Sequence, residues 1–123
     1  MQMNESSENY LETILMLSQK LPVVRSINIA NELEFSKPSV SVAMKKLRES
    51  GYIEMDQNGF ITLTSAGLAI AEKVYDRHKT LSSFLESLGV NAEVAAEDAC
   101  RIEHVISPES FAALKEYLKN REA

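Results

Sequence analysis

The feature that most constrains the fold of this 123-residue chain is a helical segment that begins at Ser36 and runs directly into a hairpin signal. Ser36 is a favourable helix cap, and Pro38 is tolerated in the first turn because its missing amide would have no helical partner there. Gly51 is the expected end of this helix. Two β-prone runs, 52–55 and 60–63, then flank an Asn-Gly pair, a strong short-range signal for a β-hairpin. The segment therefore predicts a capped helix followed at once by a two-stranded hairpin.

Two shorter helical patterns precede this segment. Apolar residues recur at helical spacing over 7–20, where Ser6 or Ser7 is the expected cap. A second pattern, with apolar residues three positions apart, predicts a short helix over 26–33 behind Ser26. Helix, short turn, helix and hairpin in this order are typical of a winged helix-turn-helix.

The remainder of the chain has the pattern of a helical domain. A long helix is predicted over about 65–88, a fifth helix over about 91–105, and a sixth from the Ser-Pro pair at 107–108. The predicted caps of these helices are Thr64 or Ser65, Asn91 and Ser107. We therefore predict a mainly α protein with a winged helix-turn-helix DNA-binding domain in residues 1–65 and a helical domain in residues 66–123.

Charge is distributed unevenly along the chain, although its net value is −5. Residues 21–48 contain two acidic and five basic residues, whereas the segments on either side are acidic. In a helix-turn-helix the second helix enters the major groove, where lysines contact phosphates and short polar or apolar side chains contact base edges. The residues that we expect to contact DNA are Ser36, Lys37, Pro38, Ser39, Ser41, Val42, Lys45 and Lys46. Double-stranded DNA is thus the predicted partner; the alternatives are a merely solvated basic face or a winged helix that binds proteins.

Three residues of the predicted fifth helix have the spacing of a metal site. Cys100, Glu103 and His104 occupy positions i, i+3 and i+4, which places a thiolate, a carboxylate and an imidazole on one helix face. Residues one turn apart on a helix can hold one ion between them, as paired histidines do in metal-binding helices. The alternative is a buried small cysteine beside a Glu-His pair that faces solvent. Taken alone the motif is weak, so the prediction depends on ligands from other helices.

Such candidate ligands occur on two other predicted helices. His78 lies on the apolar stripe of the long helix, where an aliphatic residue is expected; the alternative is a core histidine that is hydrogen-bonded to a neighbour. Glu12 borders the apolar face of the first helix, where an unpaired carboxylate would be costly to bury. Asn9, one turn earlier, offers an amide oxygen.

Four segments together resemble a known family. They are NYLETILML at 9–17, SKPSVSVAMKKLRESGYI at 36–53, YDRH at 75–78 and EDACRIEHVIS at 97–107. In this order and at these separations they resemble the diphtheria toxin repressor and manganese transport regulator family of metal-dependent repressors, over nearly the whole chain. The resemblance implies that an ion-loaded dimer binds operators upstream of metal-uptake genes. By position, it implies as metal ligands Asn9, Glu12, His78, Cys100, Glu103 and His104.

The implied ligand set combines features of two branches of that family. Cys100 resembles the iron-responsive branch, whereas Glu12 resembles the manganese-responsive branch. Ser82 and Ala96 stand where the iron branch has the ligands of its second site. Fe²⁺ or Mn²⁺ is therefore the expected cofactor, with the thiolate favouring iron because manganese prefers harder donors.

The predicted function is a metal-responsive transcriptional repressor that controls metal-homeostasis genes. A homodimer is expected because one recognition helix reads few bases, which makes residues 66–123 a helical metal-binding and dimerisation domain. Its candidate dimer surface comprises Leu81, Leu85, Leu88, Val94, Phe111 and Leu114. No membrane span or signal peptide is predicted, so a cytoplasmic location is expected. The alternatives are a winged-helix regulator that does not depend on metal, a winged-helix interaction module and a metalloenzyme; we predict that the chain is not an enzyme.

Overall fold

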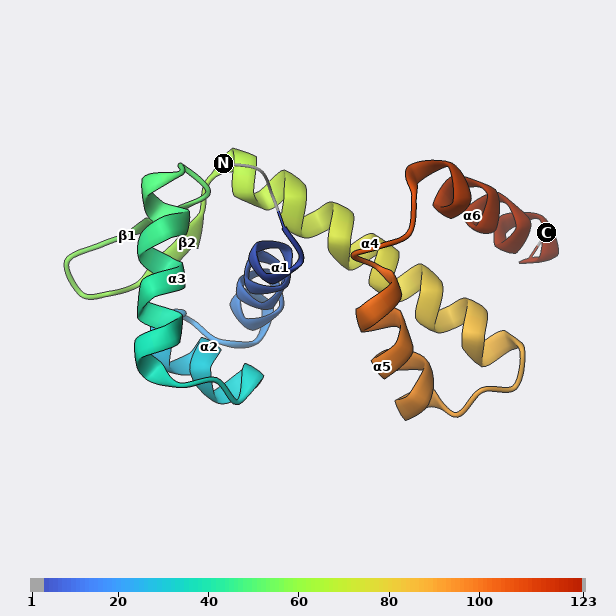
Figure 1. The fold of residues 1–123 in the computed structure, drawn as a ribbon, viewed down its shortest axis with the longest axis horizontal. Helices are drawn as coiled ribbons and strands as arrows, with labels where there is room; N and C mark the ends of the chain where they lie inside the picture. Colours follow the sequence, from blue (N-terminus) through green and yellow to red (C-terminus); the bar gives the residue numbers. More distant parts are fainter. Residues whose placement is uncertain (1–3, 123) are drawn as a thin grey trace. The chain divides into compact units, whose positions relative to one another are not determined.

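The computed structural model describes residues 4–122 and is mainly helical, as predicted (Figure 1). The elements follow the predicted order of helices and hairpin along the chain. Their bounds are α1 Glu5–Lys20, α2 Ser26–Leu33, α3 Lys37–Glu49, β1 Ile53–Met55, β2 Ile61–Leu63, α4 Ser65–Ser87, α5 Ala92–Ile102 and α6 Pro108–Glu122.

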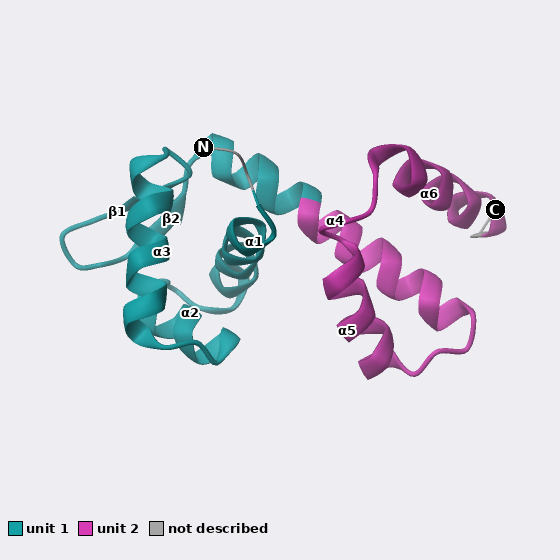
Figure 2. Ribbon diagram, in the orientation of Figure 1, with its two compact units in different colours: residues 1–73 teal, residues 74–123 magenta. Residues whose placement is uncertain are grey.

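The chain forms two compact units, which Figure 2 colours separately. Unit 1 comprises Met1–Lys73 and unit 2 comprises Val74–Ala123, so the boundary falls within α4. Unit 1 holds α1 to α3, the hairpin and the first part of α4, and unit 2 holds the rest of α4 with α5 and α6. Among the helices described, none is long and apolar enough to cross a lipid bilayer.

Unit 1 is built around one apolar core. Helix α1 contributes Leu11 and Ile14 to this core. Helix α3 contributes Val40, Met44 and Leu47, whose spacing places them on one helix face. The other buried members are Tyr10, Leu17, Val24, Ile29, Ala30, Ile53, Ile61 and Ala71. Because α3 is anchored along its buried stripe, its opposite face is held at the surface of the unit.

The starts of α3 and α1 are fixed by side-chain caps. Ser36 caps α3 as predicted, since its hydroxyl accepts a hydrogen bond from the Ser39 amide at 3.3 Å. The prediction for α1 was wrong, because the cap is Asn4 rather than Ser6 or Ser7. The Asn4 side-chain oxygen accepts from the Ser7 amide at 2.8 Å, so the helix begins earlier than its apolar pattern.

The start of α2 also differs from the prediction. Its N-cap is Arg25 rather than Ser26, which is already the first residue of the helix. The Asn28 side-chain oxygen accepts a hydrogen bond from the Arg25 main-chain amide at 2.8 Å. A side chain inside the first turn therefore reaches back to the cap residue, and the serine is not needed as a cap.

The predicted hairpin is present, with β1 antiparallel to β2 and Met55 opposite Ile61. Asp56 organises its turn, because its carboxylate accepts hydrogen bonds from the Asn58 amide at 2.8 Å and the Phe60 amide at 2.9 Å. Gly59 has a φ of 80°, a left-handed conformation that glycine adopts without steric cost. These local contacts explain why the Asn-Gly signal was sufficient to place the turn.

The first turn of α4 approaches the hairpin so closely that only glycine fits there. A Cβ atom added at Gly67 would lie 2.0 Å from the main-chain oxygen of Tyr52. The Thr64 hydroxyl accepts from the Gly67 amide at 3.2 Å and donates to the Gly51 carbonyl at 2.7 Å. The start of α4 is thereby fixed to the chain that leaves α3.

In unit 2 the predicted caps of α5 and α6 are confirmed. The Asn91 side chain accepts from the Glu93 amide at 2.9 Å, and the Ser107 hydroxyl accepts from the Ser110 amide at 3.0 Å. The predicted end of α5 was wrong, because the helix stops at Ile102 rather than near Val105. The buried apolar side chains of this unit are Val74, Leu81, Ala95 and Ala99.

Candidate DNA-binding surface and metal centre

The eight residues predicted to contact DNA all lie exposed at the start and outer face of α3. The two valines of this helix show how its buried and exposed faces differ, since Val40 is fully buried whereas Val42 is 55% exposed. Lys37, Lys45 and Lys46 are exposed as well. The helix therefore presents hydroxyl groups, one apolar side chain and three ammonium groups to solvent, the chemistry that contacts phosphates and base edges.

Beside this face lies a hollow that the sequence did not predict. The start of α1 lines one side of it with Asn4, Ser6 and Ser7, and α3 lines the other with Ser39 and Lys46. Tyr10 forms part of its wall, and burial raises the pKa of the Tyr10 hydroxyl above its usual value. Polar groups of α1 therefore lie on the same side of unit 1 as the exposed face of α3.

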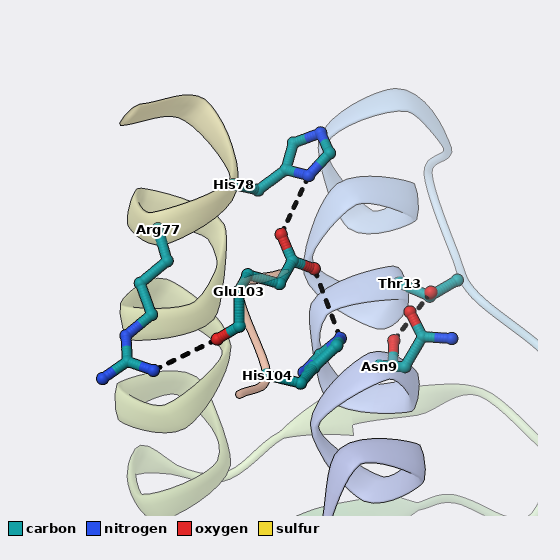
Figure 3. A network of polar contacts seen from close by, with 6 residues as sticks. All are labelled: Asn9, Thr13, Arg77, His78, Glu103 and His104. Atoms are coloured by element: carbon teal, nitrogen blue, oxygen red, sulfur yellow. Dashed lines mark hydrogen bonds and ion pairs between the residues drawn. The ribbon is translucent and has the colours of Figure 1, made fainter. Parts of the chain in front are cut away.

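The candidate metal centre is built around Glu103 of unit 2 (Figure 3). One oxygen of its carboxylate lies 2.9 Å from Nδ1 of His78, and the other lies 3.3 Å from Nε2 of His104. The Glu103 side chain is fully buried, His104 is 2% exposed and His78 is 24% exposed. Two imidazole rings from α4 and from the end of α5 thus converge on one buried carboxylate.

The end of α5 brings Glu103 and His104 into a turn rather than onto the helix itself. Glu103 is the C-cap of α5, and His104 follows it in the turn that leads toward α6. Cys100 lies on the helix one turn earlier and is half-buried. The two histidines and Arg77 contact Glu103. The helix therefore ends just before Glu103, although Glu103 keeps helical backbone angles and its amide still bonds to the Ala99 carbonyl.

Arg77 is a buried residue of this centre that sequence reasoning missed. Its guanidinium donates hydrogen bonds to the main-chain carbonyls of Glu103, at 3.1 Å, and Ile106, at 3.2 Å (Figure 3). It also lies 5.6 Å from the centre of the Phe111 ring. The only sequence signal was an arginine beside His78 on a helix with an apolar stripe, which by itself does not identify a partner.

The remaining predicted ligands, Glu12 and Asn9, lie on α1 in unit 1. They are one turn apart and so occupy one side of that helix. Glu12 is 4% exposed and Asn9 is half-buried. The Asn9 main-chain oxygen accepts a hydrogen bond from the Thr13 hydroxyl at 2.8 Å, so the amide oxygen of the Asn9 side chain is not used in that contact.

The donor set of unit 2 fits a divalent transition metal. Imidazole and carboxylate groups bind Fe²⁺ and Mn²⁺, and a thiolate on the neighbouring turn adds a softer donor. The contact to Glu103 uses Nδ1 of His78, so its Nε2 lies on the other side of the ring. A histidine in contact with a carboxylate is a common arrangement in metal sites.

Comparison with known proteins decides the family. Residues 2–59 match the model of the iron dependent repressor N-terminal DNA binding domain, and residues 64–123 match the model of the iron dependent repressor metal binding and dimerisation domain. The chain belongs to the iron-dependent repressor family. The family resemblance and the winged-helix architecture predicted from the sequence are thereby confirmed.

Its relatives in the iron-dependent repressor family are transcriptional regulators. An HTH-type regulator of Methanocaldococcus jannaschii is 35% identical over 119 residues, which cover 95% of both chains. The regulator MntR of Escherichia coli O157:H7 is 33% identical over 111 residues, or 90% of this chain and 72% of that protein. Because the family consists of regulators, the metalloenzyme alternative is not supported.

Solved structures of repressors in this family share the fold. The manganese regulator SloR matches with a TM-score of 0.82 and 29% identity, over 97% of this chain and 55% of that one. A manganese-dependent transcriptional repressor in complex with manganese matches with a TM-score of 0.85 and 26% identity, over 92% and 52%. The chain thus spans about half the length of these solved structures.

Proposed function

We propose that this protein is a transcriptional repressor whose binding to operator DNA depends on Fe²⁺ or Mn²⁺. We assign DNA binding to residues 1–65, and metal binding and dimerisation to residues 66–123. The observation that carries the proposal is the buried Glu103 carboxylate contacted by two histidine rings, in a chain whose other unit exposes a basic helix. A buried carboxylate beside two imidazoles is a donor set suited to a dication.

The proposed ligands are those predicted from the sequence. Glu103, His104, His78 and Cys100 come from unit 2, and Glu12 and Asn9 come from α1 of unit 1. The ion supplies positive charge that the carboxylates and the thiolate share. The thiolate favours iron, whereas a glutamate at position 12 is the feature that resembles manganese regulators.

Ligands on both units would make the ion a link between metal binding and DNA binding. Helix α1 supports this role because it carries Glu12 and also packs, through Leu11 and Ile14, into the core that anchors α3. An ion that binds the DNA-competent arrangement better than the alternatives raises DNA affinity, and DNA raises ion affinity by the same factor. A coupling of ~1–3 kcal/mol corresponds to roughly a 5- to 150-fold change in affinity.

The proposed DNA partner is a two-fold symmetric operator bound by a homodimer. A dimer would place two α3 helices in major grooves about 34 Å apart, or a multiple of that spacing. Unit 2 supports dimerisation with apolar side chains that are exposed in the single chain, including Leu88 at 65% and Val94 at 47%. Leu81, by contrast, belongs to the core, because only 2% of it is exposed. We propose a cytoplasmic location, because the relatives come from prokaryotes, in which the DNA lies in the cytoplasm.

The proposal is tested by DNA selection followed by titration. Purified protein is used to select duplexes from a random-sequence library in the presence of Mn²⁺ under reducing conditions. Fluorescence anisotropy then measures affinity for the selected duplex with Mn²⁺, with Fe²⁺ and with a chelator. We expect tight binding with either metal and a loss of roughly 5- to 150-fold in chelator. Equal affinity under all three conditions would instead establish a winged-helix regulator that does not depend on metal.

A further inference from the structure

The turn that carries two of the proposed ligands is not held by a continuous helix. The last helical bond of α5 is from the Glu103 amide to the Ala99 carbonyl, at 2.9 Å. Beyond it, the amides of Val105 and Ile106 both bond to the Ile102 carbonyl, at 3.0 and 2.9 Å. The last carbonyl groups of a helix lack partners further along it, so contacts from other elements can bind them and add to these local bonds.

Arg77 supplies those contacts from α4. The same guanidinium nitrogen, Nη1, donates to the carbonyl of Glu103 at the start of the turn and to that of Ile106 at its end. Arg77 is 8% exposed, and its partners in the described part of the chain are these carbonyls and the Phe111 ring. A buried positive charge that donates to carbonyls at a helix C-terminus is favourable, because the helix dipole places negative charge there.

Two consecutive residues of α4 therefore fix Glu103 at both of its ends. Arg77 binds its main-chain carbonyl, and His78 contacts its carboxylate at 2.9 Å. The first contact orients the main chain of the turn, and the second restricts rotation of the Glu103 side chain. His104, the next residue, takes its backbone orientation from the same turn.

We propose that Arg77 is a positioning residue for the metal centre, which sets ion affinity without contacting the ion. The inference rests on the proposed function, since it assumes that Glu103 and His104 are ligands. Loss of groups that orient metal ligands typically lowers metal affinity by roughly 10- to 100-fold. We expect a loss in that range for Arg77→Met, which keeps the length of the side chain but removes the donors.

The test measures Mn²⁺ affinity by calorimetry in the full-length protein, for wild type and for the variants Arg77→Met, Arg77→Lys and Arg101→Met. Arg101 is exposed on α5 and serves as the matched control, for which we expect wild-type affinity. Arg77→Lys keeps the charge and the ability to donate, but its side chain is shorter and lacks the planar guanidinium that fixes the direction of the two N–H bonds, so we expect intermediate affinity. Thermal melts in chelator identify the temperature at which every variant is folded, and all titrations are made below it.

A second readout separates positioning from general destabilisation. The absorption spectrum of the Co²⁺-loaded protein reports the arrangement of donors around the ion. We expect an altered spectrum for Arg77→Met or, if that variant does not fold, for Arg77→Lys. Wild-type Mn²⁺ affinity together with an unchanged Co²⁺ spectrum in the folded variant would overturn the proposal for Arg77.

Glu103→Gln is measured in parallel, so that an error in the proposed metal centre can be distinguished from an error in the role of Arg77. If wild type binds no Mn²⁺, or if Glu103→Gln binds it as tightly as wild type, the proposed metal centre is wrong and the role of Arg77 is overturned with it. If Glu103→Gln loses affinity and Arg77→Met does not, only the role of Arg77 is wrong. Weakened binding in both variants, with Arg101→Met unaffected, supports both.

Discussion

The two units of this protein differ in what they bury. Unit 1 has one extended apolar core to which α1, α2, α3 and the hairpin all contribute. Among the described residues, unit 2 has four buried apolar side chains, two of them alanines, and buries two charged groups, the guanidinium of Arg77 and the carboxylate of Glu103, whereas unit 1 buries one, the carboxylate of Glu12. Apolar burial stabilises a fold by itself, whereas buried charge is stable only when it is compensated. Unit 1 is thus stabilised mainly by apolar packing, whereas unit 2 depends more on the compensation of buried charge.

The largest expected effect tests how much the apolar core of unit 1 contributes to stability. Leu11→Ala removes a fully buried side chain from unit 1 and is expected to cost about 2–5 kcal/mol of unfolding free energy. Val105→Ala in unit 2, where the side chain is 75% exposed, should cost within about 0.5 kcal/mol. Urea denaturation in chelator measures both. Equal costs would mean that a side chain in the apolar core of unit 1 contributes no more to stability than an exposed one.

The next effect concerns the buried carboxylate. Glu103→Ala, or His104→Ala, should abolish the metal-dependent gain in operator affinity, a loss of roughly 5- to 150-fold, because it removes a proposed ligand. Melting temperature in chelator should stay near that of wild type. The exposed Glu97 on the same helix provides the control, Glu97→Ala. A metal response that survives in the Glu103 and His104 variants would exclude this site as the sensor.

A smaller effect is expected at the surface of unit 1. Lys46→Ala should weaken binding to all duplexes alike and reduce the slope of log affinity against log salt by about one unit, because one phosphate contact is lost. Anisotropy titrations at several salt concentrations measure this slope. If affinity falls at one operator position only, Lys46 contacts a base and the electrostatic interpretation is wrong.

The smallest effect concerns the choice of ion rather than the response itself. Cys100→Ser replaces a soft donor with a harder one, so competition titrations should show a preference shifted from Fe²⁺ toward Mn²⁺. The response of DNA binding to metal should persist. Identical preferences in the two proteins would remove the argument that connects the thiolate with iron.

Sequence reasoning succeeded where structure is determined locally. Ser36, Asn91 and Ser107 were identified as caps because a cap and the amide that it binds lie two or three residues apart. The hairpin turn was equally readable, since the bonds of Asp56 stay within the turn. The exposed face of α3 followed from helical spacing in the same way.

It failed at two local features, the caps of α1 and α2, where Asn4 and Arg25 take the positions predicted for serines, and it failed where distant parts of the chain decide the outcome. The end of α5 was placed too late, because no glycine or proline marks it and the turn after Ile102 is held by Arg77, which lies 26 residues before Glu103. The contact of His78 with Glu103 spans 25 residues, and helical spacing contains no information about such a pair. The ligand assignment at His78 therefore rested on family resemblance rather than on geometry.

Gly67 limits which residues the start of α4 can accept. A methyl group at this position would force either the first turn of α4 or the Tyr52 carbonyl to move, because the added Cβ would lie 2.0 Å from that oxygen. The same movement would disturb the hydrogen bonds of the Thr64 hydroxyl to the Gly67 amide and the Gly51 carbonyl. One hydrogen atom in place of a side chain thus allows the main chain of a helix to lie directly against the main chain that leads into the hairpin.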